Sequence, residues 1–289
     1  MERLLIIGCG DIARRTIPLI RGQYRTYAMT RNNMQCDSLR AMGVVPLAGD
    51  LDNRKGLSRI AGLADIVLHF APPPNAGTKD SRTRHLLAAL SRGSLPRQFI
   101  YISTSGVYGD CRGARVNETH ILNPQSPRAQ RRVDAETQIR AWARENGVRA
   151  SILRVPGIYA EDRLPLERLQ AGMPGIRADE DSYTNHIHAD DLARIVVSAL
   201  RRARANRVYN ASDDGEMKMG DYFDAVADAY NLPRQPRISR AEAQRSLPES
   251  LLSFMNESRR LTNDRMKREL RVRLRYPTVR HALEFHMHD

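Results

Sequence analysis

Short apolar runs alternate with amphipathic stretches along most of the chain. The apolar runs are nearly uninterrupted and rich in Ile, Val, Leu, Phe and Tyr, as expected of strands that are buried on both faces. The predicted strands are Arg3–Ile7, Thr26–Thr30, Val44–Leu47, Ile66–Phe70, Gln98–Ser103 and Ala150–Val155, and the predicted helices cover residues 11–21, 33–42, 53–61, 80–92 and 128–146. This regular alternation predicts an α/β fold with a doubly wound parallel sheet.

The last part of the chain departs from this alternation. One more helix and strand are predicted at residues 189–204 and Arg207–Asn210, and the flanking segments are rich in proline and short helical patterns. We therefore predict a large domain formed by residues 1–155 plus 188–214, and a smaller, irregular substrate lobe formed by residues 156–187 plus 215–289. Ligands of open parallel sheets bind beyond the carboxyl ends of the strands, so the smaller lobe should form the other wall of the site.

Composition narrows the list of partners. The 289 residues carry a formal net charge of +13, and because few of the basic residues are lysines, the excess comes from arginine. The arginines are dispersed instead of concentrated in a basic tail, so we expect no nucleic-acid partner, and a protein recruited to nucleic acid by charge is the weakest alternative. No apolar stretch approaches the ~20 residues of a membrane span. Three scattered cysteines form no disulfide or metal pattern, so we expect a cytoplasmic protein. The partner that we expect is a small-molecule substrate, and we expect no membrane partner.

A glycine-rich turn directly follows the first predicted strand. Its residues Gly8, Cys9, Gly10, Asp11, Ile12 and Ala13 read G-x-G-x-x-A. The glycines allow the backbone to approach a pyrophosphate, the small Ala13 lets the next helix pack against the strand, and the helix N-terminus offers N–H donors to the phosphates. Because this motif opens a doubly wound pattern, it predicts a Rossmann-type dinucleotide site.

The end of the second predicted strand bears on the choice of dinucleotide. An acidic residue there would bind the adenosine ribose and favour NAD, but the chain has Thr30 and Arg31. A guanidinium can pair with a 2′-phosphate, so NADP(H) is favoured over NAD(H). Asp50 and Leu51 follow the third strand, where a carboxylate can accept from the adenine amino group.

With these residues in place, the chain resembles the extended short-chain dehydrogenase/reductase superfamily. More narrowly, it is similar to an atypical bacterial branch of the NAD(P)-dependent epimerase/dehydratase family. The motifs that carry the resemblance are Ile7–Ala13, Gly49–Leu51, Tyr101–Asp110, Leu153–Tyr159, His186–Ala193, Val208–Asn210 and Ser258–Asn263. We also expect cofactor contacts from Phe70, the last residue of the fourth predicted strand, from Ala71 and Pro72 after it, and from Pro156 after the sixth strand.

The resemblance implies chemistry performed by a Ser/Thr, a Tyr and a Lys. Thr104 stands at the Ser/Thr position, but Arg128 stands where the proton-transferring Tyr is expected and Arg132 where the Lys is expected. Arginine is effectively never deprotonated in proteins, so Arg128 cannot exchange a proton near neutral pH. Arg132 can still bind the nicotinamide ribose, lower the pKa of a nearby phenol or anchor an anionic substrate.

Three interpretations of this departure stay open at this level. Another phenol, Tyr108, Tyr159 or Tyr183, can replace the missing Tyr, although Tyr108 and Tyr159 can equally be packing residues. A different proton donor can act, such as a substrate group, water, or His186 and His188, whose spacing without a third ligand does not indicate a metal site. Finally, the protein can bind NADP(H) without turnover.

The function expected from the sequence is that of an NAD(P)(H)-binding oxidoreductase or epimerase with a non-standard active site. Its substrate would be small and polar, with nucleotide sugars as one such class, and a catalytically silent NADP(H) sensor or scaffold is the alternative. Family dehydratases carry an Asp-Glu pair after the Thr, and this chain has Ser105 and Gly106 there, so 4,6-dehydratase activity is not expected. The resemblance also implies a homodimer through the helix at residues 128–146.

Overall fold

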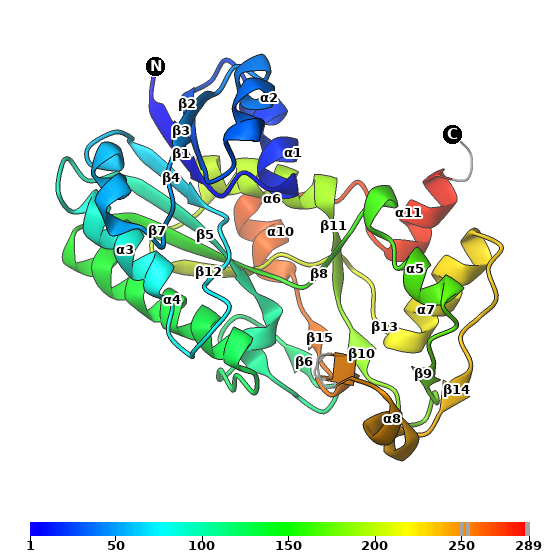
Figure 1. The fold of residues 1–289 in the computed structure, drawn as a ribbon. Helices are drawn as coiled ribbons and strands as arrows, with labels where there is room; N and C mark the ends of the chain where they lie inside the picture. Colours follow the sequence, from blue (N-terminus) through cyan, green and yellow to red (C-terminus); the bar gives the residue numbers. More distant parts are fainter. Residues whose placement is uncertain (249–250, 253–254, 287–289) are drawn as a thin grey trace.

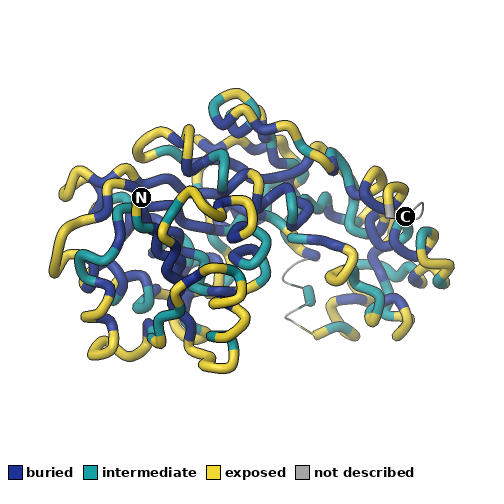
Figure 2. Tube along the Cα trace, turned by 90° about the horizontal axis from the view of Figure 1, so that it is seen from above, coloured by how far each residue is buried: buried dark blue, intermediate teal, exposed yellow. Residues whose placement is uncertain are grey.

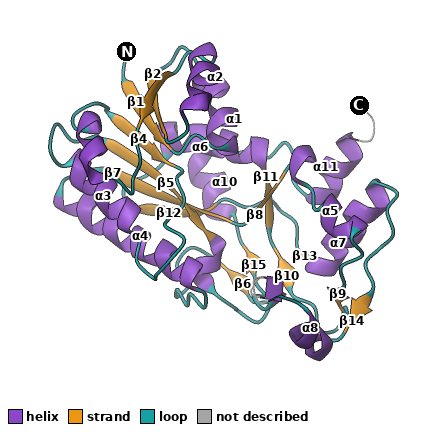
Figure 3. Ribbon diagram, in the orientation of Figure 1, coloured by secondary structure: helices purple, strands orange, loops and turns teal. Residues whose placement is uncertain are grey.

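A seven-stranded parallel sheet forms the core of the larger part of the molecule, in the order β12-β7-β5-β4-β1-β2-β3 (Figures 1 and 3). The computed structural model describes residues 1–248, 251–252 and 255–286 of the chain. The strands are β1 Arg3–Ile7, β2 Arg25–Thr30, β3 Val45–Ala48, β4 Ile66–His69, β5 Gln98–Thr104, β7 Arg149–Val155 and β12 Arg207–Asn210. The predicted Rossmann-type doubly wound sheet is therefore confirmed, with strand boundaries within two residues of those expected.

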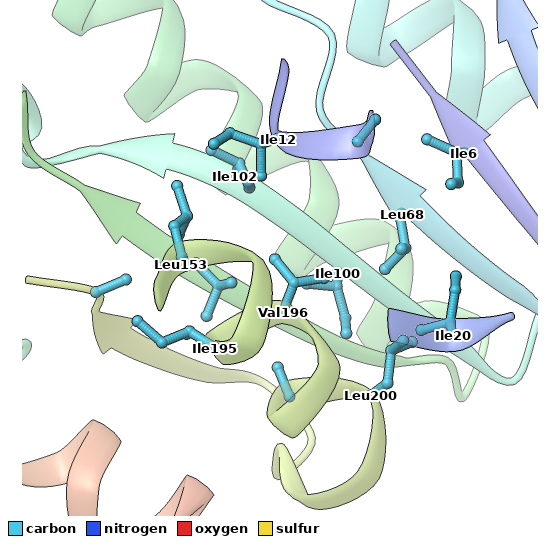
Figure 4. Close-up of a cluster of buried hydrophobic side chains, with 14 of the residues drawn as sticks. Ile6, Ile12, Ile20, Leu68, Ile100, Ile102, Leu153, Ile195, Val196 and Leu200 are labelled. Atoms are coloured by element: carbon cyan, nitrogen blue, oxygen red, sulfur yellow. The ribbon is translucent and has the colours of Figure 1, made fainter. Parts of the chain in front are cut away.

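Burial on both faces explains why the strands read as continuous apolar runs. Along β1, Leu4 and Ile6 pack into one core cluster and the intervening Leu5 and Ile7 into another, because successive side chains of a strand point to opposite faces. Figure 4 shows part of the first cluster, in which Ile6 and other strand residues meet side chains of helices α1 and α6.

Helices cover both faces of this sheet. The helices α1 Asp11–Ile20, α2 Cys36–Ala41 and α6 Ala189–Arg202 contribute to the first cluster, and the 3₁₀ helix η2 Arg54–Ile60 and the helices α3 Ser81–Leu90 and α4 Pro127–Glu145 contribute to the second. Figure 2 shows buried chain running through the middle of the molecule and exposed loops around it. None of the helices in the described ranges is both long and apolar enough to cross a bilayer.

Two predicted helices differ in form from the expectation. Residues 33–42 divide into a 3₁₀ turn, η1 Asn33–Gln35, followed by α2, and the segment predicted at 53–61 is entirely 3₁₀. In both cases an asparagine precedes the turn: Asn32 Oδ1 accepts from the N–H of Met34 and Asn53 Oδ1 from that of Lys55. Such Asx turns compete with α-helical hydrogen bonding, and the hydrophobic pattern does not reveal them.

The smaller lobe has its own apolar cluster, built mainly from α5, α7 and α11. The remaining elements are β6 Arg115–Val116, β8 Gly157–Tyr159, α5 Leu166–Gln170, β9 Gly175–Ile176, β10 Tyr183–Thr184, β11 His186–His188, β13 Met217–Lys218, α7 Met219–Ala229, β14 Arg237–Ile238, α8 Arg240–Ser246, β15 Arg260–Leu261, α10 Asp264–Leu270 and α11 Val279–His286, with 3₁₀ turns η3 Ser105–Tyr108 and η4 Glu161–Arg163.

One segment of the predicted smaller lobe belongs with the sheet instead. Met266 and Leu270 of α10 are fully buried in the first core cluster, and α10 packs against α6 and β12. The predicted assignment of residues 215–289 to the smaller lobe is therefore wrong for this helix, because its apolar face is covered by the larger domain.

Candidate functional site

Two adjoining cavities lie at the carboxyl edge of the sheet. The first, of about 650 Å³, is lined by residues that follow β1, β2, β3 and β4. The second, of about 410 Å³, is lined by residues at the ends of β4, β5 and β7, by residues of α4 and by residues of the smaller lobe. Pro72 lines both cavities, so the two adjoin along the edge where doubly wound folds bind their ligands.

The turn after β1 is shaped for close approach by a phosphate. Gly8 has a φ of +93°, and a Cβ atom placed on it would lie 2.6 Å from the backbone nitrogen of Ala71. Gly10 is the N-cap of α1 and supplies no side-chain acceptor to the first-turn N–H groups of this helix. These groups and the helix dipole suit a pyrophosphate, and the residues present therefore fit a dinucleotide.

A substitution at Gly8 tests this fit. In Gly8→Ala the new Cβ collides with the backbone of Ala71, and the positive φ adds about 1–2 kcal/mol of strain, so we expect lower stability and loss of NADPH binding. Gly22→Ala is the matched control, because Gly22 also has a positive φ but has open space around it. Thermal unfolding and NADPH titration of both variants check this, and retained NADPH affinity in Gly8→Ala would contradict the placement.

The far end of the first cavity contains the residues expected to choose between NAD and NADP. Thr30, Arg31, Asp50 and Leu51 all line it. The Thr30 hydroxyl lies 3.1 Å from Gln35 Oε1, which places the short turn after β2 against the cavity. Ala71 and Pro72 line the cavity as predicted, too.

Arg82 also lines this cavity and was not singled out from the sequence. Its guanidinium forms a two-point pair with Asp52, at 2.9 and 2.6 Å, and donates to the carbonyl oxygens of Pro72 and Pro73 at 3.2 Å. It thereby fixes the proline-rich loop between the two cavities. No local sequence signal marks it, because its partners lie in other loops.

Four of the predicted cofactor residues do not line either cavity in the structure. Ile12 and Ala13 are buried in the core beneath the loop, and Phe70 packs against the same core. Asp11 points to Arg15 and Arg163, at 2.8 and 2.9 Å. Their side chains therefore support the loop, and only the backbone N–H groups of residues 11–13 remain candidates for a phosphate contact.

The second cavity brings together three of the predicted catalytic residues and one predicted cofactor residue. Thr104, Arg128, Arg132 and Pro156 all line it. The Thr104 hydroxyl accepts from the N–H of Gly106 at 3.2 Å, which closes the turn after β5. This position at the end of a buried strand holds the hydroxyl at the edge of the sheet.

The guanidinium of Arg132 is held against β5. Its Nη1 donates to the Tyr101 hydroxyl at 2.9 Å and to the carbonyl oxygen of Ile102 at 2.8 Å. Burial raises the pKa of Tyr101 to about 12 despite the nearby cation, so this phenol stays protonated and accepts the hydrogen bond. Arg132 is therefore a fixed positive charge close to Thr104.

Glu257 and Arg259 contribute to this cavity from the far end of the sequence. They pair at 2.8 Å, and Arg259 also donates to the carbonyl oxygen of Gly109 at 2.7 Å. A Cβ atom placed on Gly106 would lie 3.6 Å from Thr104 Oγ1 and 3.8 Å from Glu257 Oε2. Glu257 thus places a carboxylate close to Thr104, in the space that a side chain at Gly106 would enter. No local pattern in the sequence indicates this proximity, because Thr104 and Glu257 are 153 positions apart along the chain.

The three candidate phenols have different positions. Tyr108 is 1% exposed, donates to Asn210 at 2.7 Å and accepts from Arg154 at 2.9 Å, and Tyr159 is buried among aromatic rings of the smaller lobe. Neither lines the second cavity, so a catalytic Tyr108 does not agree with the geometry, and the packing interpretation is favoured for both. Tyr183 does line the cavity, with the Arg260 guanidinium 4.8 Å from its ring centre.

The two histidines are structural in this arrangement. His186 stacks on Tyr222 at 4.2 Å, and burial lowers its pKa to about 4, so it stays neutral. His188 Nδ1 accepts from the N–H of Asp190 at 3.2 Å and caps α6. Neither lines the second cavity. In the described part of the chain, no three or more His, Cys, Asp or Glu side chains are grouped so as to hold a metal ion.

Comparison with known families agrees with this arrangement. Residues 5–212 match the family model of the NAD dependent epimerase/dehydratase family. The protein belongs to this family. The match to the epimerase/dehydratase family covers six strands of the sheet in full and β1 from Leu5 onward, and the resemblance stated from the sequence motifs is confirmed. The family is enzymatic and binds an NAD(P) cofactor.

Curated relatives of the family are nucleotide-sugar enzymes. The dTDP-glucose 4,6-dehydratase of Mycobacterium tuberculosis is 30% identical over 213 residues, which cover 66% of this chain and 63% of the relative. The GDP-6-deoxy-D-mannose reductase of Pseudomonas aeruginosa is 26% identical over 214 residues, 63% of this chain and 70% of that protein. The match with the mycobacterial enzyme thus spans less than two thirds of its length.

Solved structures match over almost the whole chain. A conserved protein of unknown function from Silicibacter pomeroyi has a TM-score of 0.81 and 30% identity, covering 100% of this chain and 99% of its own. The UDP-glucuronic acid 4-epimerase of Bacillus cereus, solved with UDP-glucuronic acid and NAD, has a TM-score of 0.76 and 20% identity, covering 99% and 98%. At that identity, the second match shows the shared fold alone.

Proposed function

We propose that this family member is an NADP(H)-dependent oxidoreductase or epimerase that acts on a small polar substrate of the nucleotide-sugar class. One observation carries the proposal: the two cavities adjoin at Pro72, so the glycine turn and Thr104 lie in neighbouring cavities along the same edge of the sheet. The relatives that act on nucleotide sugars support the substrate class. A homodimer through α4 and a cytoplasmic location stay predictions.

Different residues of the second cavity orient the substrate and bind the cofactor. Thr104 donates or accepts one hydrogen bond and orients the reacting hydroxyl or carbonyl of the substrate. Arg132, fixed against β5, offers its guanidinium to the nicotinamide ribose. The cofactor, when bound, supplies hydride transfer, and the chain's own groups have to hold the substrate and move the proton.

We assign the proton transfer to Glu257. Arg128 at the usual Tyr position cannot exchange a proton, whereas a carboxylate can. Thr104 Oγ1 and Glu257 Oε2 both lie within 4 Å of the position that a Cβ atom on Gly106 would take, and both residues line the second cavity, so the carboxylate and the hydroxyl are near neighbours at one end of it. Tyr183 is the runner-up, because it is the one candidate phenol of the three that lines the cavity.

A catalytically silent NADP(H) sensor is the second candidate function. The replacement of the usual Tyr by Arg128 favours it. A panel of nucleotide sugars incubated with the protein and NADP⁺ or NADPH separates the two, by absorbance at the nicotinamide band and by product analysis for redox-neutral epimerisation. If the protein binds the cofactor but converts none of the nucleotide sugars in the panel, the sensor function is favoured. No binding of either cofactor would contradict both.

The preference for NADP(H) is tested at Arg31. If its guanidinium binds the 2′-phosphate, Arg31→Ala should weaken NADPH binding by about 10–100-fold, the equivalent of one hydrogen bond to a charged group, and leave NADH binding unchanged. Arg59→Ala is the matched control, because Arg59 is exposed on η2 and does not line either cavity. Titration of all three proteins with both cofactors measures the effect, and equal losses for NADPH and NADH would contradict the assignment.

A further inference from the structure

Basic residues that are dispersed along the sequence gather on one surface of the folded protein. Residues 194–207 and 264–275 together hold eleven arginines or lysines and two acidic residues, a net charge of +9 out of the +13 of the whole chain. The first range covers most of α6 and the start of β12, and the second covers α10 and the chain that follows it. Helices α6 and α10 pack against each other over the first core cluster, so the two ranges form one surface, called here the basic face (Figure 1).

Helix α6 directs arginines away from the sheet. Its inner side, which includes Ile195 and Ala199, is fully buried in the first core cluster. Arg194, Arg201 and Arg202 are exposed. Because seven or eight residues correspond to about two helical turns, these three side chains share the outer side of the helix.

The chain after α10 adds a second row of arginines beside α6. Arg271 and Arg273 are exposed, whereas Val272 between them is buried in the core cluster that α6 also covers. This alternation is typical of an extended segment with one side on the core, and it turns the arginines outward. The backbone N–H of Arg275 donates to Asp191 at 2.9 Å, so the segment ends at the N-terminal part of α6.

Several charges of the basic face have no carboxylate partner. Arg202, Arg268, Arg271 and Arg273 form no ion pair with an acidic side chain of the described ranges. Glu269 is next to Arg268 in the sequence, but its side chain is 5% exposed and is paired at the start of β12. Neighbouring cations without counter-charges repel one another, and a bound polyanion removes this repulsion.

The basic face extends to the edge of the sheet opposite the two cavities. Arg207 is the first residue of β12, and its pair with Glu269, at 2.5 Å, holds the C-terminal end of α10 at the amino edge of the sheet. The cavities lie at the carboxyl edge, and no residue of either range lines them. The charge therefore does not serve the cofactor site or the second cavity.

We propose that the basic face binds the phosphate backbone of double-stranded nucleic acid, independently of base sequence. The residues that carry the contact are Arg201, Arg202, Arg268, Arg271 and Arg273. Guanidinium groups pair with phosphates through two parallel hydrogen bonds, and rows of cations fit a polymer that carries a charge at every step better than a single small anion.

The apolar content of the surface favours a duplex over other polyanions. Neither range contributes a large exposed hydrophobic side chain, so the basic face has no aromatic ring for stacking of single-stranded bases and no apolar group for insertion into a lipid surface. The proposal departs from the expectation based on the dispersed arginines. Dispersion along the chain does not prevent clustering in space, because α6 and the segment after α10 meet only in the fold.

Fluorescence anisotropy of a short labelled DNA duplex, titrated with the full chain, tests the proposal. Affinity should fall by about 100-fold between 50 and 200 mM salt, the effect expected of about four phosphate contacts, and two duplexes of unrelated sequence should bind alike. Arg202→Gln combined with Arg273→Gln should weaken binding at 50 mM salt by about tenfold or more. The same variant should reduce the slope of log affinity against log salt by about 2.

The matched control is Arg59→Gln combined with Arg92→Gln. Both residues are exposed, and they lie on η2 and directly after α3, which cover the other face of the sheet. This variant loses the same charge and should bind the duplex nearly as well as the unmodified protein. Equal losses in the two double variants would show attraction to net charge alone and overturn the proposal.

Competing polyanions distinguish the remaining partners. A single strand, vesicles that contain phosphatidylserine, or polyglutamate that bound more tightly than the duplex would assign the basic face to another partner, as would binding that is insensitive to salt. If the Arg202 and Arg273 variant does not fold, this comparison on the unmodified protein decides alone. NADPH affinity should be unchanged in both variants, so a failure of duplex binding leaves the proposed function standing.

Discussion

Replacing Glu257 by glutamine is expected to lower kcat by about 10²–10⁴-fold, the usual contribution of a positioned acid or base. Glutamine has nearly the same shape and can keep a hydrogen bond to Arg259, but it cannot take a proton. NADPH affinity should change little, because Glu257 lines only the second cavity. The measurement is steady-state kinetics, with any substrate that the nucleotide-sugar panel identifies, together with NADPH titration of the variant.

Tyr183→Phe is the matched variant, because it removes the other candidate proton donor from the same cavity. We expect it to reduce kcat far less than Glu257→Gln does. The opposite order of effects would show that the phenol moves the proton and that Glu257 only positions Arg259. Equal and small effects of both would assign the proton to a substrate group or to water.

Replacing Arg154 by leucine is expected to destabilise the fold by about 3–5 kcal/mol, the cost of leaving a buried charge without its partner. The Arg154–Glu136 pair is 2.7 Å long, and its side chains are 4% and 3% exposed. Glu136 also accepts from Ser103 at 2.6 Å, so its carboxylate joins α4 to the end of β5. Urea unfolding of the variant measures the loss.

Two further variants separate the buried pair from a general effect of arginine. Arg234→Leu removes an exposed partner of Asp228 and should change the free energy of unfolding little, because surface ion pairs are screened by solvent. The double variant Arg154→Leu with Glu136→Leu should recover part of the stability, since no unpaired charge is left. A loss in Arg154→Leu no larger than that in Arg234→Leu would contradict the importance of the buried pair.

The Arg154 network also explains the position of Thr104. Ser103 directly precedes Thr104, and its hydrogen bond to Glu136 fixes the end of β5 against α4, the helix that carries Arg128 and Arg132. Tyr108 belongs to the same network through Arg154. The Tyr108 hydroxyl is thus used in a structural hydrogen-bond network. This structural role explains why a tyrosine stands at this position without lining the second cavity.

The sequence by itself determined the sheet and the glycine-rich turn after its first strand. Strands buried on both faces need continuous apolar runs, and a turn that approaches a phosphate needs glycine, so both leave local patterns that can be recognised within a few residues. The start of α4 is marked in the same way by Ser126 and Pro127, and this local signal is what places Arg128 and Arg132 on the first turns of that helix. These features depend on neighbours in the chain.

The tertiary structure alone decided which side chains meet at the second cavity. Glu257 reaches Thr104 and Arg82 reaches the proline loop only because separate loops converge at the carboxyl edge of the sheet. The tertiary structure also distinguished two phenols that the sequence left as alternatives. Tyr108 is buried away from the second cavity, whereas Tyr183 lines it. Convergence of this kind depends on packing between segments distant in sequence, and packing leaves no local pattern to read.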